Sequence, residues 1–426
     1  TNASAVATIS FTTLATVPGT TGTPTAVAGN AQATVTVSAP TSGGTPTSYT
    51  VTAAPQVAGV DRTCTVTGAS GSCTVTGLTN LSNYSFKVVA YRGNTGTGWS
   101  SVMKRVPEAF PKFLYISLPI LILTFFFKGD VIFHWMHHGV TEVGSANYDK
   151  IIAGKSGYLN KNFFLIRLVV FGGLWILLWN MLRKKSLEED LNGGTEYFTQ
   201  LVKIGTAFIV IFGASSSIFA WDWVMSIDTH WFSTMFGWYM FSSWHVTTYA
   251  VIVLTILFLK DKGLMGYVNE NHLHDLGKFM FAFSIFWTYV WFEQFLLIYY
   301  ANLPEETIYF LERWEGYDKL YKSSEILMVI LNFLLPFLVL MTRDAKRTRI
   351  FLKIAAFLII AGHYIDFYQM IMPGVVGKHG GYGLVEFGMV TVFASAFIYV
   401  ISGELTKASL VAKNHPFLPE ALHHDI

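Results

Sequence analysis

The sequence has 426 residues, of which 52% are hydrophobic, 16% aromatic and only 13% charged. Soluble domains carry about 25% charged residues, so this composition excludes a disordered chain and a single soluble globule. The low charge also excludes a nucleic-acid binder with a basic face, and the formal net charge of +2 points to no partner. We predict two domains, at residues 1–103 and 104–426, because Thr, Ser, Gly and Val dominate the first segment and long apolar runs dominate the second.

The first domain is predicted to be a small all-β sandwich. Residues 20–103 contain short segments with β-branched or aromatic side chains at every second position, separated by turn residues. This period is that of a strand with one buried face, and several short strands at such spacing are typical of a sandwich. The predicted strands are residues 33–38, 49–53, 63–67, 73–76 and 84–91.

Residues 77–86 (GLTNLSNYSF) resemble the tyrosine-corner strand of a fibronectin type III domain. The two cysteines, Cys64 and Cys73, lie in predicted strands that the turn at residues 68–71 joins, so we predict a disulfide across this hairpin. A disulfide would indicate an oxidising compartment, and two buried thiols are the alternative. The domain contains no catalytic constellation, and we expect a role in adhesion or spacing.

The second domain is predicted to be an all-α polytopic membrane bundle of about eight transmembrane helices. A helix needs about 20 largely apolar residues to cross a bilayer. Eight stretches qualify, with Trp and Tyr crowding their ends as interfacial anchors do. They cover roughly residues 113–135, 162–182, 203–227, 232–259, 277–301, 324–342, 349–371 and 383–404.

The basic residues predict how this bundle is oriented. Lys and Arg are more frequent in the segment before the first helix, in alternate loops and in the C-terminal tail than in the other loops. By the positive-inside rule, both ends of the membrane domain are then cytoplasmic. A disulfide-bearing domain at a cytoplasmic end is unusual, and two explanations stay open. Either the cysteines are reduced, or the junction near residues 101–104 joins segments that are not naturally continuous.

Ionisable residues in the predicted helices gather in the half of the bilayer that faces away from the cytoplasm. Because charges inside a bilayer are costly and mark functional sites, we predict a polar pocket open to the outer face. His363 and Asp366 share a helix face at i and i+3, so the carboxylate can orient the imidazole. Glu293, on a stripe with Tyr289, joins this pair as the strongest candidate. Five further residues are candidates for a proton path or a quinone site: Arg167, Asp222, Asp228, His230 and His245.

Structural roles are the alternative for several of these residues. His245 can serve an interhelical hydrogen bond, and Arg167 can pair with a nearby carboxylate or extend to the interface. Another group lies close enough to the predicted interface to be solvated or to cap helices: Asp228, His230, Glu325 and Glu386. No metal site is predicted, because the neighbouring histidines at the end of the first helix have no partner cysteine: His134, His137 and His138.

The motifs of common redox cofactors do not occur. There is no C-x-x-C-H haem motif, Walker loop or Rossmann glycine pattern, and iron–sulfur clusters need several cysteines. We therefore expect no cofactor bound by this chain. A b haem between His245 and His363 is an alternative, against which their different predicted depths argue. A secondary transporter would need internal repeats and broken helices, and Pro336 after Asn332 is the one convincing mid-helix break.

Several segments within residues 104–426 resemble a membrane subunit of bacterial alternative complex III, a quinol:cytochrome c or quinol:oxidase oxidoreductase. The segments are residues 104–113 (KRVPEAFPKF), 153–167 (AGKSGYLNKNFFLIR), 186–191 (SLEEDL), 217–236 (SIFAWDWVMSIDTHWFSTMF), 287–303 (WTYVWFEQFLLIYYANL), 325–347 and 363–373. They match the second of the two large integral subunits, which are related to the membrane anchor of polysulfide reductase. That family has ten helices, whereas this sequence predicts eight, with a β domain in place of the first two.

The resemblance implies a subunit of the bacterial inner membrane that has no redox centre of its own. Its partners would be a homologous membrane subunit and subunits that carry c haems and iron–sulfur clusters, with cytochrome c or a terminal oxidase accepting the electrons. The subunit would provide a proton path, with binding of quinone or quinol as a further role and a purely structural scaffold as the alternative. The implied role falls on the candidates within matched segments: Asp222, Asp228, His230, Glu293, His363 and Asp366.

Overall fold

The computed structural model describes residues 9–13, 23–39, 46, 48–55, 62–91, 98–193, 195–422 and 424. Contacts between residues divide the chain into two compact units. One unit holds Thr1–Ser101 with Asn192–Thr199 and Asn414–Ala421, and the other holds Val102–Leu191, Gln200–Lys413 and Leu422–Ile426.

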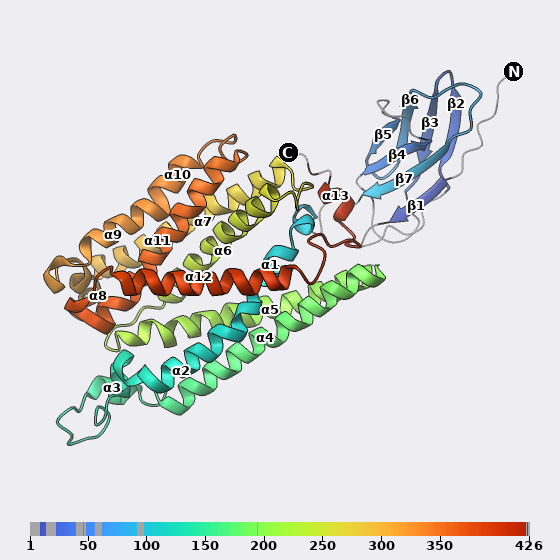
Figure 1. The fold of residues 1–426 in the computed structure, drawn as a ribbon. Coiled ribbons are helices and arrows are strands. Elements are labelled where there is room, and N and C mark those ends of the chain that lie inside the picture. Colours follow the sequence, from blue (N-terminus) through green and yellow to red (C-terminus); the bar gives the residue numbers. More distant parts are fainter. Residues whose placement is uncertain are drawn as a thin grey trace. The chain divides into compact units, whose positions relative to one another are not determined.

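The β domain consists of two β-sheets (Figure 1). One has the order β1 (Ile9–Thr13), β7 (Ser85–Tyr91), β4 (Ser48–Ala54), β5 (Thr63–Thr67), and the other has the order β2 (Thr25–Gly29), β3 (Gln32–Val37), β6 (Gly71–Thr76). β1 pairs parallel with β7, and the other pairs are antiparallel. Alternate residues such as Val35, Val51 and Val88 are fully buried between the sheets. The predicted sandwich is confirmed, and β1 and β2 are strands that the prediction missed.

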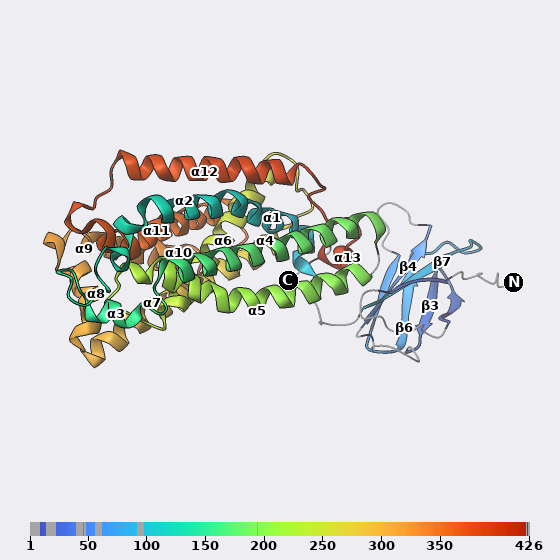
Figure 2. The same cartoon turned by 90° about the horizontal axis from the view of Figure 1, so that it is seen from below.

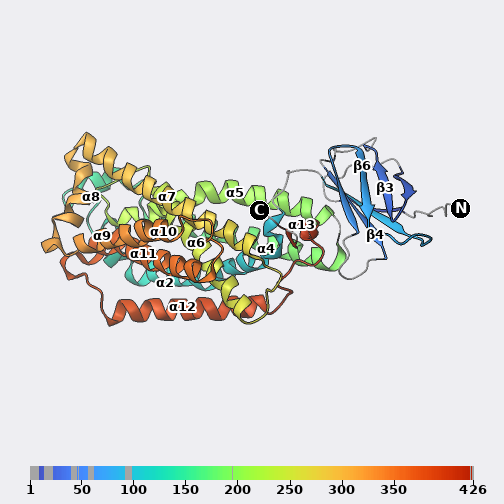
Figure 3. The ribbon, with the colours of Figure 1, turned by 90° about the horizontal axis from the view of Figure 1, so that it is seen from above.

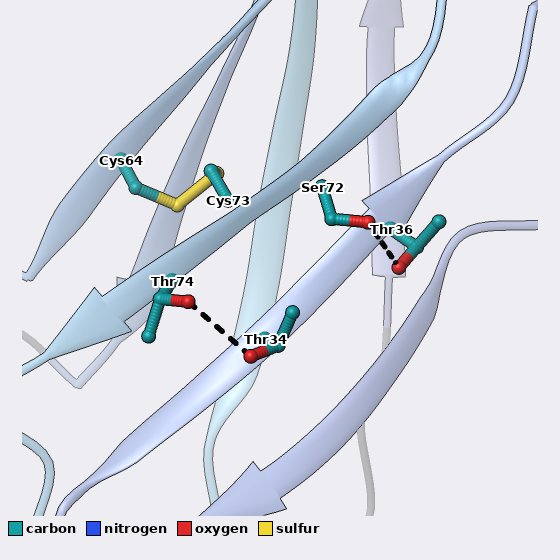
Figure 4. Close-up of a disulfide and its surroundings, with 6 residues drawn as sticks. All are labelled: Thr34, Thr36, Cys64, Ser72, Cys73 and Thr74. Atoms are coloured by element: carbon teal, nitrogen blue, oxygen red, sulfur yellow. Dashed lines mark hydrogen bonds between the residues drawn. A yellow bond between two sulfur atoms is a disulfide. The ribbon is translucent and has the colours of Figure 1, made fainter.

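A disulfide and several hydrogen bonds of polar side chains stabilise this domain. The Tyr84 hydroxyl accepts a hydrogen bond from the Thr79 backbone N–H at 2.9 Å, as expected for a tyrosine corner. Cys64 and Cys73 form a disulfide with their Cα atoms 5.8 Å apart. Since β5 and β6 belong to different sheets, this bond ties the sheets together (Figure 4). Hydroxyl pairs that link β3 to β6 lie beside it in the same view, at 3.3 Å for Thr34–Thr74 and 2.7 Å for Thr36–Ser72.

The second unit is helical, and eight of its described helices are long and apolar enough to cross a membrane. This number agrees with the prediction. The spans are Arg105–Ile132, Lys161–Asn192, Glu196–Ile227, Phe236–Asp261, Glu270–Ala301, Lys322–Val339, Arg349–His379 and Leu384–Leu405. Their main helices are α2 (Leu114–Ile132), α4 (Lys161–Asn192), α5 (Thr195–Trp223), α6 (Phe236–Asp261), α7 (Glu270–Ala301), α9 (Lys322–Val329), α10 (Leu335–Val339), α11 (Arg349–Val376) and α12 (Leu384–Leu405).

Short helices complete this unit. They are α1 (Arg105–Ala109), which precedes α2, α3 (Lys150–Lys155) and α8 (Pro304–Trp314). We call the end of the bundle where α8 lies, and where α7 and α11 finish, the α8 end (Figure 1). By the predicted orientation this is the outer end.

α11 occupies the centre of the bundle. It packs against α6 and against α9, and α6 packs in turn against α7. α12 lies along the edge of the bundle in Figures 2 and 3. Its contacts are with α1 and the turn Phe110–Phe113, where the Phe397 ring lies 5.4 Å from that of Phe110. The packed group of α6, α7, α9 and α11 is therefore where a buried site can form.

The sixth span is interrupted in its middle. α9 is followed by a π-helical turn, Ile330–Leu334, and then by α10. Pro336 explains the break, because proline has no N–H to donate and its ring displaces the carbonyl one turn earlier. A methyl group on Gly362 would come within 2.1 Å of Asn332 Oδ1, so α11 can approach this turn closely only with glycine there.

Ion pairs fasten α1, α4 and α12 at the end opposite α8. Arg105 Nη2 lies 2.7 Å from Asp190 Oδ2, and Arg183 joins Glu108 at 3.1 Å and Glu404 at 3.4 Å. These partners lie on α1, on the last turns of α4 and on α12. The predicted span ended near residue 182, whereas α4 continues as a helix to Asn192. The ion pairs explain this difference, because they hold the last turns of α4 against α1 and α12.

Candidate functional site

The centre of the candidate site is the carboxylate of Asp366, which is completely buried on α11. Its Oδ1 accepts a hydrogen bond from the Tyr239 hydroxyl. Its Oδ2 accepts hydrogen bonds from the Ser243 hydroxyl at 2.8 Å and the Trp287 indole at 3.0 Å, and lies 3.0 Å from His363 Nδ1. We call these five residues the Asp366 cluster. Its partners offset the cost of placing a carboxylate in an apolar interior.

Three helices supply the Asp366 cluster. His363 and Asp366 are three residues apart on α11, and Tyr239 and Ser243 are four apart on α6, so each pair shares a helix face. Trp287 comes from α7, and its ring meets the His363 imidazole edge-on at 5.2 Å between centroids. The His363 Nε2 atom is buried and has no hydrogen-bond partner in the described part of the chain. This imidazole can therefore still accept or donate a proton at Nε2.

A second carboxylate, Glu325, is buried between the Asp366 cluster and the α8 end. Glu325 Oε1 accepts from the Trp291 indole at 3.2 Å, and Oε2 accepts from Gln369 Nε2 at 3.0 Å. Glu325 is 5% exposed, so it is not solvated at the interface, although its place in the sequence allowed that role. It is an interior group rather than a solvated residue at an interface. Glu325 and Asp366 also interact electrostatically.

Arg313 on α8 connects this interior with the surface. Its Nε donates to the Gln369 carbonyl at 2.9 Å, and its Nη2 donates to Asp228 Oδ2 at 2.9 Å. The guanidinium stacks on Tyr309, 3.4 Å from the ring centroid. Burial raises the pKa of Tyr309, so its phenol stays neutral beside the cation. Asp228 is thus the counter-ion of a buried arginine, a role that the sequence did not indicate.

A polar cavity of about 450 Å³ opens at the α8 end. Its position at the ends of α2, α5 and α11 brings together segments far apart in the sequence, and of the candidate residues it is lined by Asp228 and His230. His134 and His137 lie 5.0 Å apart between ring centroids, and His134 and His230 lie 5.9 Å apart. Burial, with some repulsion from His137 and His230, lowers the pKa of His134. The polar residues lining this cavity are His134, His137, Asp228, Thr229, His230, Tyr309, Glu312 and Tyr317.

His230 is held at this cavity by Asp149. Its Nε2 lies 2.7 Å from Asp149 Oδ2, while Asp149 Oδ1 caps α3 by accepting from the N–H groups of Ile151 and Ile152. The backbone bond from Ile152, followed by the bond to His230, lowers the pKa of Asp149. One carboxylate therefore fixes both the start of α3 and the orientation of a cavity histidine.

We expect Asp149→Ala to raise the hydrogen-exchange rates of the Ile151 and Ile152 amides about fivefold, since an N-cap contributes about 1 kcal/mol. Asp149→Asn keeps the cap and is the control, with nearly unchanged exchange. Because the folded pKa of Asp149 is lowered, the protection is complete above the ordinary carboxyl range and is lost as the pH falls through the folded value. Equal exchange in wild type and Asp149→Ala would contradict this role.

Arg167 and Asp222 form a buried ion pair between α4 and α5. Arg167 Nε and Nη2 donate to the two Asp222 oxygens at 2.7 and 2.9 Å, and Nη1 donates to the Tyr158 carbonyl at 3.2 Å. Burial, with the negative charge of Asp222, raises the pKa of Tyr158 to about 12. No described contact joins this pair to the Asp366 cluster. Arg167 therefore has the structural role that the sequence offered as an alternative, which is to pair with a nearby carboxylate.

Glu293 does not join the His363–Asp366 pair, and this corrects the sequence-based expectation. Glu293 is six residues from Trp287 on α7, which turns it by about 240° away from the interior face. It lies on the same helix face as Tyr289, which is 58% exposed. Trp287 takes the place expected of Glu293. The four-residue spacing of Trp287 and Trp291 shows that they share a helix face, but not that this face meets α11.

His245 is also separate from the cluster. Its ring is packed among aromatic rings, with centroids 4.3 Å away for Phe283, 5.0 Å for Tyr249 and 5.1 Å for Phe241. Ser242, three residues before His245, is buried and donates to the Tyr239 carbonyl. Within the described residues, no group of three or more His, Cys, Asp or Glu side chains has the arrangement of a metal site.

Comparison with known proteins identifies the first domain. Residues 22–106 match the family Fibronectin type III domain. No curated protein matches the chain. Together with the eight apolar helices, this defines a multi-pass membrane protein with an N-terminal fibronectin type III domain.

Proposed function

We propose that this chain is a proton-conducting membrane subunit of a bacterial quinol oxidoreductase of the alternative complex III type. The resemblance within residues 104–426 supports the class of complex, and the buried carboxylates support the role. On this proposal the partners are haem c and iron–sulfur subunits and a homologous membrane subunit. The membrane is the bacterial inner membrane, with both ends of the helical domain in the cytoplasm.

The observation that carries the proposal is a series of polar side chains from the α8 end to the centre of the bundle. Arg313 donates to the Asp228 carboxylate and to the backbone carbonyl of Gln369, and the side-chain amide of Gln369 donates to Glu325. Beyond Glu325 lies the Asp366 cluster. Carboxylates and an imidazole in an apolar interior can each take up and release a proton, which is the chemistry that a relay needs.

Each group has a distinct role in this proposal. Asp366 and His363 hold the proton at the centre, with the Tyr239 and Ser243 hydroxyls as neighbouring donors and acceptors. Glu325 is the next acceptor toward the α8 end, and Arg313 holds both the Gln369 backbone and Asp228 in place. The polar cavity at that end exchanges protons with water. No redox group of this chain is required.

A quinone site at the same residues is the second candidate, because these groups could hydrogen-bond the two oxygens of a quinone ring. The packing favours the relay. Both Asp366 oxygens are already engaged by side chains of α6, α7 and α11. A quinone ring would have to displace Trp287 or Tyr239, both of which are buried.

The test is quinol-driven turnover and proton release in the reconstituted complex, comparing wild type with Glu325→Gln and Asp366→Asn. We expect the electron-transfer rate to hold while proton release beyond the two protons that each oxidised quinol must give up falls at least tenfold, because an amide cannot take up the relayed proton. Glu293→Gln, on the exposed side of α7, is the matched control and should leave both rates unchanged.

The other outcomes are informative. If turnover and proton release fall together while the complex stays intact, the quinone site becomes the better explanation. If neither changes in Glu325→Gln or Asp366→Asn, the subunit is a scaffold for its partners and the proton-relay proposal is wrong.

A further inference from the structure

Three buried side chains near the break in the sixth span have polar atoms without a hydrogen-bond partner. They are Asn332, with both of its amide atoms, Ser284, with its hydroxyl, and His363, with Nε2. None of these atoms is bonded to another residue in the described part of the chain, and each of the three residues is at most 1% exposed. Buried polar groups in folded proteins are almost always bonded to protein or to ordered water, so this group requires an explanation.

Contacts between α7 and the sixth span place Ser284 level with the π-helical turn. The Phe281 ring stacks on that of Phe337 with 5.2 Å between centroids, and ten residues further along α7 the Trp291 indole donates to Glu325 at 3.2 Å. Ser284 is three residues after Phe281 and seven before Trp291, so it shares their face of α7. The two helices run in opposite directions, and Ser284 therefore lies opposite the turn between the two contacts.

α11 brings the third side chain to the same level. Gly362 touches the turn, because a methyl group there would come within 2.1 Å of Asn332 Oδ1, and His363 is the next residue. The His363 ring lies 5.2 Å from that of Trp287, which follows Ser284 by one turn on α7. The three side chains thus meet on the side of the Asp366 cluster that faces away from the α8 end.

The chemistry of this site combines hydrogen-bond donors with acceptors. Asn332 offers an NH2 group and a carbonyl oxygen, and the Ser284 hydroxyl and His363 Nε2 can each donate or accept. Pro336 adds an acceptor, because it has no N–H to give to the backbone carbonyl four residues earlier. Water both donates and accepts, so it satisfies all of these groups, whereas a cation cannot accept from the Asn332 NH2 group.

We propose that the break in the sixth span binds internal water, held by the Asn332 amide, the Ser284 hydroxyl and His363 Nε2. The water is the partner of His363 on the side opposite Asp366, since His363 Nδ1 already faces that carboxylate at 3.0 Å. Its role in proton transfer rests on the proposed function. In that role the water exchanges a proton with His363 Nε2, so the relay continues past the Asp366 cluster into the half of the bundle away from the α8 end.

X-ray radiolysis of the full chain in detergent tests this site, because hydroxyl radicals formed from bound water oxidise the side chains beside it. Mass spectrometry should find Trp287 oxidised in wild type, although this residue is completely buried. Ser284→Ala and Asn332→Leu remove polar atoms with little change in volume, and each should lower the oxidation of Trp287 about threefold, since internal water needs two to four polar partners. Ser216→Ala is the matched control and should leave it unchanged, because Ser216 is a buried serine of α5 that donates to the Gly213 carbonyl.

Three results would overturn the water site. They are an absence of Trp287 oxidation in wild type, equal effects of Ser284→Ala and Ser216→Ala, and a Tm that rises in sodium chloride but not in choline chloride for wild type and not for Asn332→Leu, which would identify a cation instead. If Asn332→Leu does not fold, Ser284→Ala decides alone.

The role in the relay has its own readout. In the reconstituted complex, Ser284→Ala should lower proton release beyond the quinol protons about threefold and leave electron transfer unchanged, whereas unchanged proton release would overturn this role. Oxidation of Trp287 needs no turnover. The water site can therefore be confirmed where the Glu325→Gln test rejects the relay, and rejected where that test confirms it.

Discussion

Asp222→Ala is expected to lower the free energy of unfolding of the helical domain by about 3–5 kcal/mol. The substitution leaves the Arg167 guanidinium without its two carboxylate bonds at a site where the two side chains are only 6% and 4% exposed. An unpaired buried charge is far more costly than the intact pair is stabilising. The difference in free energy of unfolding is measured by unfolding each protein in detergent and monitoring its helical circular dichroism signal.

Two controls separate the cost of the lone charge from the loss of packing. The double variant Arg167→Met with Asp222→Leu removes both charges and should recover most of the lost stability. Asp261→Ala removes a partner of Lys353 in a pair that is 41% and 35% exposed, and should change stability far less than Asp222→Ala, because exposed ion pairs contribute little. A small effect of Asp222→Ala, equal to that of Asp261→Ala, would show that water reaches the Arg167 site.

Removing the disulfide is expected to destabilise the fibronectin type III domain by about 3 kcal/mol. The loop between Cys64 and Cys73 has a sequence separation of 9, and closing a loop of this size restricts the unfolded chain by about that amount. In addition, the bond joins β5 of one sheet to β6 of the other, so its loss loosens the link between the sheets.

Hydrogen exchange of the full chain measures this effect in the variant Cys64→Ser with Cys73→Ser. Peptides from β5 and β6 should exchange more than tenfold faster, because each 1.4 kcal/mol corresponds to about a factor of ten. Peptides from α6, α7 and α11 in the same sample are the internal control and should be unaffected. If β5 and β6 exchange as in wild type, the sandwich core alone holds the sheets, and the thiols would serve equally well when reduced.

Local patterns in the sequence predicted the fold class of both domains. The two-residue period of segments such as 63–67 predicted strands, and apolar runs about 20 residues long predicted the eight spans. The His363–Asp366 contact followed from a three-residue spacing on one helix. Each of these features depends on residues that are close in the sequence, and so on the geometry of a single element.

The composition of the candidate site depended on which helix faces meet. Glu293 and Trp287 lie on the same helix, and nothing local to α7 says which of them faces α11. Glu325 was predicted to lie near an interface, yet it is buried, and so is Arg313, which the sequence did not single out. Tyr239 and Ser243 became partners of Asp366 only because α6 packs against α11.

The sequence by itself determined that this protein has a fibronectin type III domain and eight helices long and apolar enough to span a membrane. The tertiary structure alone decided that Asp366 is the centre of a buried cluster, that Arg167 pairs with Asp222, and that Glu293 stands apart. The reason is physical. Hydrophobic periodicity is a property of one segment, whereas the partner of a buried charge is chosen by the packing of segments far apart in the chain.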